Sequence, residues 1–257
     1  MKLIQSRDNP FFKELVKLGS SARQRGKAGV TLLDGAHLLA AYLDAGHQPR
    51  HILVNAAALQ DDEIAALLAN LRDVSITQLH DKLFAELSEL KTPTGILALI
   101  DLVPPSVSAC RFALLLEDIQ DPGNLGSMLR SAAAAGCDAV FLSPGCADAW
   151  SPRVLRAAMG GHFCLNIHEQ QDLPRVAAEF AGKLLATTLQ ATRSLYECDL
   201  IGNVAFMMGN EGAGLSEELL ALATHAVTIP MPGGVESLNA AAATAICLFE
   251  AVRQRIG

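Results

Sequence analysis

The chain has 257 residues, 51% of them hydrophobic, and a formal net charge of −7. This length suits one large domain or two modest ones, and the apolar content is sufficient for a buried core. No apolar run approaches the roughly 18 residues of a membrane span, and the first residues, MKLIQSRDNPFF, lack the apolar core of a signal peptide. Six cysteines form no CxxC pair and have no histidine at ligand spacing, so we expect reduced thiols in a cytoplasmic protein rather than disulfides or zinc ligands.

The charge is distributed unevenly along the chain. Residues 1–30 contain seven Lys/Arg and two Asp/Glu, a balance of +5, so the remaining residues sum to −12. We call the seven basic residues the cationic arm: they are Lys2, Arg7, Lys13, Lys17, Arg23, Arg25 and Lys27. Such a segment on an acidic protein suits a phosphate backbone, although a solvated helix face would have the same composition.

The N-terminal part of the chain has the pattern of a small α/β unit. A helix is expected at DNPFFKELVKL, with Asn9 as its cap and Pro10 in its first turn. Strand-like and helical segments then alternate. Strands are expected at 30–34, 51–54, 74–79 and 96–101, and helices at 36–45, 62–71 and 81–88. The stretch 103-VPPSVSA-109, rich in Pro and Ser, is the best domain boundary.

A second α/β set follows this boundary. Strands are expected at 112–117, 139–143, 163–167, 184–188, 204–208 and 226–230. Helices are expected at 124–135, 152–159, 172–181, 216–223 and from 237 to about 255. Strands with few polar positions, separated by helices, imply a parallel sheet that is buried on both faces.

Three glycine-rich turns follow strands of this second set. They lie in 118-DIQDPGNLGSMLR-130, 209-GNEGAGLS-216 and 229-IPMPGGVESLNAAAATAICLFE-250. None contains GxxxxGK[ST] or a GxGxxG fingerprint, which disfavours a P-loop enzyme and a nicotinamide dehydrogenase. Because ligands bind at the carboxyl ends of parallel strands, we expect the three turns to form one pocket. In the last turn, Glu236, Ser237 and Asn239 precede an alanine-rich run.

These three segments, in this order, closely resemble the three motifs of SPOUT-class RNA methyltransferases of the SpoU (TrmH) family. The resemblance extends to IQSRDNPFFK, LLDGAHLL and KTPTGILALI, which are similar to that family's substrate-binding domain and, through it, to a group of RNA-binding ribosomal proteins. Asp34-Gly35 stands where relatives commonly have Glu-Gly. Three ordered motifs make the match specific, whereas any one of them alone would be weak.

The resemblance implies a fold and a cofactor. The fold would be a small N-terminal α/β RNA-binding domain (residues 1–103), a linker (104–109) and a C-terminal α/β knot, a deep trefoil knot with a parallel sheet (110–257). The cofactor would be S-adenosyl-L-methionine, with Gly209, Ile229 and Leu238 at the family's cofactor-contacting positions. Glycines let the backbone approach closely, and apolar side chains can sandwich adenine. The family also implies a homodimer with the last helix near its interface.

The implied reaction is methyl transfer to a ribose 2′-hydroxyl of RNA. Arg130 ends the NLGxxxR pattern and matches the family's catalytic arginine. Because an arginine stays protonated, we favour phosphate binding and polarisation of the hydroxyl over action as a base. Asn124 would orient the loop or the ribose, and Glu211 would hold Arg130 or the backbone. Ser237 and Asn239 would position the nucleophile or cap the last helix.

Each of these residues has a structural alternative. Asn124 and Ser237 stand where helix caps stand. Arg130 could be a surface or salt-bridge arginine, and Glu211 could be a first-turn carboxylate that complements a helix dipole. Asn239 is harder to assign to structure, because asparagine is a poor residue for a helix interior.

RNA contacts are expected in two segments. Candidate phosphate ligands are Arg23, Arg25 and Lys27 of the cationic arm and Arg153 and Arg156 in GCADAWSPRVLRAAMGGHF, where Trp150 and His162 are interpreted as structural. Ribosomal RNA is the favoured substrate because the N-terminal domain resembles that of rRNA-modifying members, and tRNA is the alternative. A non-catalytic RNA- or ribosome-binding protein on the same fold is a competing hypothesis, disfavoured because the residues that match the catalytic motifs are intact.

Overall fold

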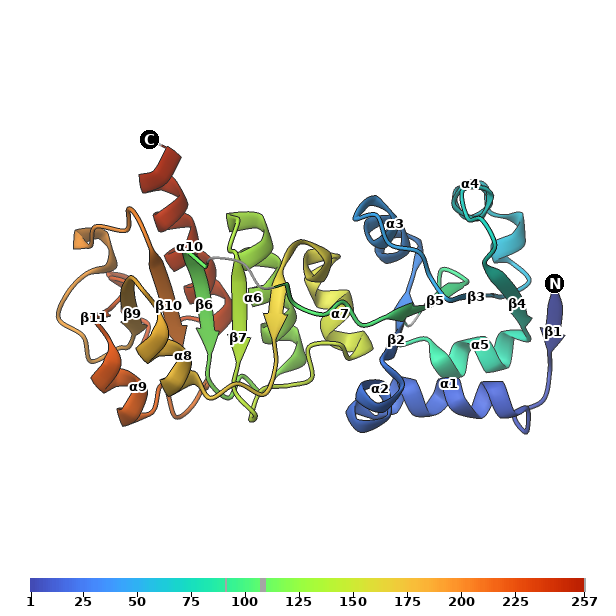
Figure 1. Ribbon diagram of the computed structural model, residues 1–257, viewed down its shortest axis with the longest axis horizontal. Coiled ribbons are helices and arrows are strands. Elements are labelled where there is room, and N and C mark those ends of the chain that lie inside the picture. Colours follow the sequence, from blue (N-terminus) through green and yellow to red (C-terminus); the bar gives the residue numbers. More distant parts are fainter. Residues whose placement is uncertain (91, 107–109, 257) are drawn as a thin grey trace. The chain divides into compact units, whose positions relative to one another are not determined.

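The computed structural model describes residues 1–90, 92–106 and 110–256 (Figure 1). The chain divides into two compact units. The N-terminal unit comprises Met1–Val103 and Trp150–Phe163, and the C-terminal unit comprises Pro104–Ala149 and Cys164–Gly257. Residues 107–109 of the expected linker, and Lys91 at the start of KTPTGILALI, lie outside the described residues.

The N-terminal unit is built on a five-stranded sheet in the order β1-β4-β3-β5-β2. The strands are β1 (Lys2–Ile4), β2 (Val30–Asp34), β3 (His51–Val54), β4 (Ser75–Leu79) and β5 (Ile96–Asp101). Strands β1, β3 and β4 are parallel, whereas β5 runs antiparallel to both β3 and β2. The expected strands are confirmed, and β1 is an additional edge strand too short to give a sequence signal.

Five helices of this unit lie before residue 103. They are α1 (Pro10–Ser20), α2 (Ala22–Ala28), α3 (Ala36–Asp44), α4 (Asp62–Ala69) and α5 (Asp81–Leu87), with a 3₁₀ turn at Ala58–Gln60. Asn9 caps α1 as expected, since its side chain accepts from the amides of Phe11 and Phe12. Helices α1 and α5 pack on one face of the sheet, where Phe12, Leu15, Leu83 and Phe84 are buried. The other face carries α3 and α4 (Figure 1).

The segment Trp150–Phe163 belongs to the N-terminal unit although its sequence lies among the elements of the second α/β set. It contains α7 (Pro152–Ala158), which packs against β2. The Thr31 hydroxyl donates to the Trp150 carbonyl at 2.7 Å. A Cβ on Gly160 would lie 2.7 Å from that of Ala41, so this position requires glycine. Trp150 and His162 are buried with ring centroids 5.1 Å apart, in agreement with a structural role.

The C-terminal unit contains a six-stranded sheet in the order β11-β9-β10-β6-β7-β8. The strands are β6 (Phe112–Leu116), β7 (Ala139–Leu142), β8 (Asn166–His168), β9 (Lys183–Thr187), β10 (Val204–Met208) and β11 (His225–Val227). All five pairings are parallel, which confirms the expected parallel sheet. The strand expected at 163–167 is wrong in part: Gly161–Cys164 is a 3₁₀ turn, and the strand starts only at Asn166.

Helices cover both faces of this sheet (Figure 1). They are α6 (Pro122–Ala135), α8 (Leu173–Glu179), α9 (Glu217–Leu222) and α10 (Ala240–Ile256), with a 3₁₀ turn at Leu195–Glu197. Helices α8 and α9 bury Leu173, Ala177 and Leu219 against one face. Helices α6 and α10 pack together on the other. Within the described residues, no helix is long and apolar enough to cross a membrane.

Candidate active site

A cavity of about 550 Å³ lies at the carboxyl ends of the strands in the C-terminal unit. Four segments line it: 187–190 after β9, 208–215 after β10, 228–231 after β11 and 237–243 at the start of α10. Asn124, in the first turn of α6, and Leu220 of α9 complete the wall. All three glycine-rich motifs therefore contribute to a single pocket, which is the arrangement expected from the sequence.

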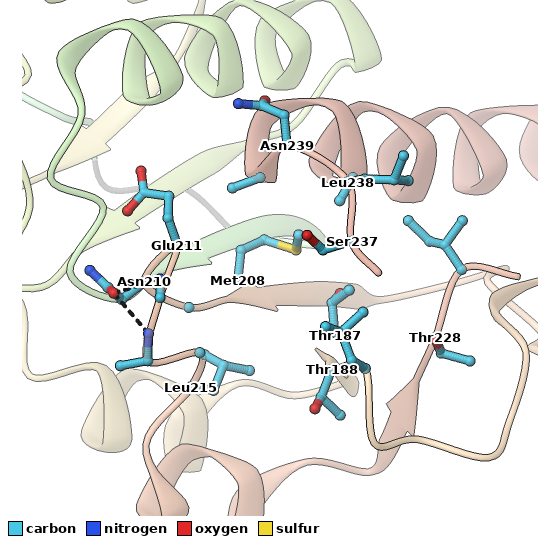
Figure 2. A pocket seen from close by; sticks show the side chains of 18 of the residues that line it. Thr187, Thr188, Met208, Asn210, Glu211, Leu215, Thr228, Ser237, Leu238 and Asn239 are labelled. Atoms are coloured by element: carbon cyan, nitrogen blue, oxygen red, sulfur yellow. Dashed lines mark hydrogen bonds between the residues drawn. The ribbon is translucent and has the colours of Figure 1, made fainter. Parts of the chain in front are cut away.

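The second motif forms a tight turn at the edge of this cavity. Asn210 and Gly214 exchange two backbone hydrogen bonds, of 3.1 and 2.9 Å. The Asn210 side-chain oxygen accepts from the amides of Gly212 and Ala213 (Figure 2). A Cβ on Gly209 would lie 2.1 Å from the carbonyl carbon of Gly214, so only glycine allows this turn to close.

A chain of side-chain hydrogen bonds joins the three motifs. The Asn124 amide nitrogen donates to a Glu211 carboxylate oxygen at 3.0 Å. The Asn239 amide nitrogen in turn donates to the Asn124 side-chain oxygen at 2.8 Å. Asn124 thus uses both ends of its amide, one toward each of the other motifs. Since the three residues are far apart in sequence, these bonds fix the three turns relative to one another.

The observed caps show that Asn124 does not cap α6, whereas Asn239 does cap α10, one of the two roles considered for it. Helix α6 begins at Pro122, two positions before the expected start. Its cap is Asp121, whose carboxylate accepts from the backbone N–H of Asn124. The Asn124 side chain is therefore free to make the contacts above rather than a cap. Helix α10 begins at Ala240 rather than near 237. Its first turn is capped by Asn239, whose side-chain oxygen accepts from the amides of residues 241 and 242.

Glu211 and Arg130 lie in surroundings that the sequence did not indicate. Glu211 is in the turn before α9, so its alternative as a first-turn helix carboxylate is wrong; Glu217 and Glu218 occupy those positions. Its observed partner is Asn124 and not Arg130. Arg130 is exposed on α6 and outside the residues that line the cavity, and within the described part of the chain its side chain makes no hydrogen bond or ion pair.

The three expected cofactor contacts all line the cavity. Gly209 forms its floor beside Met208, Ile229 is 8% exposed, and Leu238 is 37% exposed. Figure 2 shows Ser237 and Leu238 from the segment before α10 on one side, and Thr187 and Thr188 from the end of β9 on another. The lining of the cavity therefore combines apolar side chains with hydroxyl, amide and backbone groups.

The segment after β9 was missed by sequence reasoning. Thr187, Thr188, Leu189 and Gln190 line the cavity, but no glycine or charged residue distinguishes them from an ordinary strand end. Their only signal is position, because they follow a parallel strand adjacent to β10. The Thr187 hydroxyl lies 3.8 Å from the Cys247 sulfur. Burial raises the pKa of that thiol to about 12, so it is protonated and unsuited to act as a nucleophile.

The charge of the lining restricts what the cavity can hold. Among the described residues that line it, Glu211 is the only one with a charged side chain, and none is Lys, Arg or His. A cofactor with two or three phosphates would have no counter-charge there, whereas a cationic or zwitterionic ligand would be compatible. The lining thus agrees with the lack of phosphate-binding signatures in the sequence.

The candidate RNA contacts of the cationic arm separate into two kinds. Arg23 and Lys27 are exposed on α2. Arg25 is only 4% exposed, and its guanidinium donates to the carbonyls of Leu18 and Gly19 at the end of α1. Arg25 therefore stabilises the junction of α1 and α2, and its burial corrects the expectation that it contacts phosphate.

Arg153 and Arg156 both lie on α7 and both contact Glu89. An Arg156 nitrogen donates to the Glu89 carbonyl at 2.9 Å, and Arg153 lies 3.9 Å from the Glu89 carboxylate. Arg153 is exposed and Arg156 is half-buried. Neither arginine is part of the cavity at the three motifs; both belong to the N-terminal unit.

Comparison with known families identifies both parts of the chain. Residues 111–249 match the SpoU rRNA Methylase family, and residues 9–98 match the MRM3-like substrate binding domain. The first match covers more than half of the chain. The protein therefore belongs to the SpoU rRNA methylase family, and the resemblance seen in its motifs is confirmed.

Similar proteins span nearly its whole length. An uncharacterized tRNA/rRNA methyltransferase of Synechocystis sp. is 35% identical, with 98% of this chain and 94% of that protein covered. The 23S rRNA (guanosine(2553)-2′-O)-methyltransferase RlmP of Bacillus subtilis is 33% identical, with 97% of this chain and 98% of that protein covered.

Solved structures give the same result. An RNA 2′-O ribose methyltransferase superposes with a TM-score of 0.85 at 32% identity, covering 99% of this chain and 100% of that one. The SpoU methyltransferase AviRb from Streptomyces viridochromogenes, in complex with AdoMet, superposes with a TM-score of 0.87 at 27% identity, covering 97% and 99%. The α/β fold expected from the sequence is thus confirmed in both units.

Proposed function

We propose that this protein transfers a methyl group from S-adenosylmethionine to a ribose 2′-hydroxyl of RNA, with ribosomal RNA as the favoured substrate. The observation that carries this proposal is the Glu211–Asn124–Asn239 chain of hydrogen bonds at the rim of a cavity without cationic side chains. Membership of the SpoU family and likeness to a 2′-O ribose methyltransferase support the reaction type. The rRNA enzyme of Bacillus subtilis supports the substrate class.

The cavity fits the cofactor in chemistry and size. Its volume of about 550 Å³ lies within the range typical of small-molecule sites. Gly209 permits close backbone approach, and Ile229 and Leu238 offer apolar surfaces for a purine ring. Glu211, the charged residue of the lining, is an anion and so compatible with a sulfonium-bearing ligand. When bound, S-adenosylmethionine supplies a methyl group that is already activated for transfer.

The protein must align a weakly nucleophilic hydroxyl and assist the loss of its proton. We assign Asn124 to hold the ribose-facing turn, with Glu211 and Asn239 fixing both ends of its amide. Ser237 lines the cavity and is placed to contact the hydroxyl or the cofactor. Arg130 has no partner in the described residues, so its guanidinium is available to bind the phosphate beside the reacting ribose and polarise the hydroxyl.

RNA binding is assigned to the N-terminal domain, residues 1–103. Its match to a substrate binding domain supports this, as do the exposed Arg23 and Lys27. Residues 110–257 carry the methyl-transfer site in this proposal, but they include the α7 segment that packs with the N-terminal unit. We therefore assign Arg153 and Arg156 on α7 to RNA binding together with the N-terminal domain; the grouping of α7 with that unit supports this assignment.

We further infer a cytoplasmic homodimer whose C-terminal domain is a deep trefoil knot. Helix α10 presents Phe249 and Ile256 to solvent, 47% and 82% exposed. These residues are seven apart and share one face of the helix, and the small side chain of Ala242 continues that face. An exposed apolar helix face of this kind suits burial against a second copy.

The reaction is tested by incubating the purified protein with labelled S-adenosylmethionine and RNA from cells that lack the gene. Mapping of 2′-O-methyl sites should show modification of a 23S-type rRNA that is missing in those cells and restored by the protein. Methylation confined to tRNA would favour the alternative substrate. RNA binding without methyl transfer to any RNA would contradict the proposal in favour of a non-catalytic binding protein.

A further inference from the structure

A second cavity, of about 440 Å³, lies in the N-terminal unit at the carboxyl ends of the neighbouring parallel strands β1 and β4. It is lined by Gln5, Arg7, His80, Lys82 and Leu83. Gln5 and Arg7 follow β1, whereas the other three follow β4 and begin α5. Carboxyl ends of parallel strands are the usual ligand-binding edge of open α/β sheets.

The polar side chains of this cavity are all hydrogen-bond donors. The His80 Nδ1 accepts from the Lys82 amide at 3.3 Å, so a neutral His80 ring carries its proton on Nε2 and can donate it. The Lys82 ammonium has no partner within the described residues. Arg7 and Gln5 add a guanidinium and an amide, and no carboxylate lines the cavity. Four exposed donor side chains, two of them cationic, border this cavity, and together they suit an anion with several acceptor oxygens.

Two other residues of the cationic arm already have partners. Lys13 is paired with Asp8 at 2.8 Å, and Arg25 is buried against backbone carbonyls. Arg7 lines this cavity beside a second cation, Lys82. Its present partner is Glu86, which lies next to the cavity and outside its lining. The pair is exposed and weak, so an incoming anion can displace it.

We propose that this cavity binds a backbone phosphate and its adjoining nucleotide in a single-stranded segment of the RNA substrate. This inference rests on the proposed function and deepens it, since it adds an RNA contact at the β1–β4 edge to those proposed on α2. A concave pocket takes up a phosphodiester that can bend into it, which a single strand does more readily than a stiff duplex. Glu86 then acts as a built-in competitor for Arg7 in the free protein.

The test is filter binding of the full-length protein to a single-stranded oligoribonucleotide across a salt series. The double variant Arg7→Gln/Lys82→Gln should weaken binding and reduce the slope of log affinity against log salt by about 0.7 for each phosphate that the protein no longer neutralises. Lys17→Gln is the matched control, because Lys17 is an exposed arm residue on α1 outside the cavity. If the reduction in slope for each charge removed were the same in the control and the double variant, the proposal would be overturned.

A second variant should change the RNA affinity in the opposite direction, which a misfolded protein would not do. Glu86→Gln removes the competing carboxylate, so it should tighten binding of the same oligoribonucleotide and leave that of the Arg7→Gln/Lys82→Gln background unchanged. Unchanged binding by Glu86→Gln in the wild-type background would contradict the proposal. The proposal would also be contradicted if the Arg7→Gln/Lys82→Gln variant lost binding of a mononucleotide but bound the oligoribonucleotide normally. The cavity would then bind a free nucleotide and not the RNA.

The two hypotheses fail in different ways. If the wild-type protein methylates RNA but the cavity variants bind and methylate it normally, the proposed function stands and the phosphate site is wrong. If the wild-type protein binds the oligoribonucleotide through the cavity but never transfers a methyl group, the site stands and the methyltransferase function is wrong. S-adenosylmethionine binding measured by calorimetry should be the same in all of these variants.

Discussion

The polar contacts inside the pocket of the C-terminal unit differ in kind from those of the cationic arm in the N-terminal unit, whose residues form what we call the cationic surface. In the pocket, polar side chains from three distant turns bond to one another, with Asn124 at the centre. On the cationic surface, Lys13 bonds to a neighbour five residues away and Arg25 to carbonyls six and seven residues away. The pocket is thus a long-range arrangement, whereas the contacts of Lys13 and Arg25 are local; in the cationic arm, the Arg7–Glu86 pair is the long-range exception among the described residues.

This difference predicts how each region responds to substitution. In a connected arrangement, removal of one group displaces the others, so effects should be large and strongly coupled. On an exposed surface, each cation contributes separately and is screened by salt, so effects should be small and additive.

The largest effect is expected at Arg130. Arg130→Ala should lower methylation by about 10²- to 10³-fold, since it removes a group assigned to stabilise charge at the reacting ribose. S-adenosylmethionine affinity should change little, because Arg130 does not line the cavity. Arg130→Lys should recover little activity, as a point charge lacks the planar fork of guanidinium. Single-turnover methylation together with calorimetry tests this, and near-normal turnover of Arg130→Ala would restore the surface-arginine interpretation.

The next effect concerns the turn of the second motif. Gly209→Ala should destabilise that turn by about 1–3 kcal/mol, because its Cβ would lie 2.1 Å from the Gly214 carbonyl carbon. Cofactor affinity should fall in proportion, since the turn lines the cavity. Gly233→Ala is the control, because a Cβ there meets nothing within 4 Å. Calorimetric titration with S-adenosylmethionine would contradict the close-approach role of Gly209 if both variants bound it equally.

A charge exchange tests the hydrogen-bond chain itself. Asn124→Asp replaces the donor to Glu211 by a second carboxylate, which should lower activity about tenfold through loss of a hydrogen bond to a charged group. Adding Glu211→Gln restores a donor and should recover much of the activity, although Glu211→Gln alone should be harmful. Additive effects in this double-mutant cycle would mean that the two side chains act independently.

The C-terminal unit was largely predictable from sequence, because its signals are local. Buried parallel strands appear as apolar runs, and glycine-rich turns mark their carboxyl ends, so a pocket at these turns was predictable. Gly209, Ile229 and Leu238, which line it, were indicated only by the resemblance to the SpoU family. Thr187 and Thr188 did not follow, since two threonines at a strand end have no distinctive pattern. The start of α10 was placed too early because Ser237 and Asn239 are both good caps, and only the contacts of Asn239 decide between them.

The N-terminal unit was less predictable because two of its features depend on packing. Counting charges cannot separate Arg25 from Arg23, although the turn between α1 and α2 points one inward and leaves the other in solvent. The position of α7 depends on contacts with β2, such as the Thr31 bond to the Trp150 carbonyl, across a long stretch of sequence. A fragment starting at residue 110 would expose buried residues of this segment, including Val154 and Leu155.

The smallest effects are expected on the cationic surface. There, substitution of Arg25 should change stability, whereas substitution of Arg23 and Lys27 should change RNA binding. Arg25→Met should lower the free energy of unfolding by about 1.5 kcal/mol, because it removes hydrogen bonds from a charged donor to two carbonyls, and it should leave the salt dependence of RNA binding unchanged. The double variant Arg23→Gln/Lys27→Gln should leave the free energy of unfolding unchanged and lower the RNA affinity modestly. The slope of log affinity against log salt should drop by about 0.7 for each phosphate that these two side chains neutralise. Urea denaturation and filter binding on the same samples measure both quantities. If Arg25→Met reduced the slope while the protein stayed as stable as wild type, the buried arginine would have to leave its carbonyl partners to reach RNA, and the local description of this surface would be wrong.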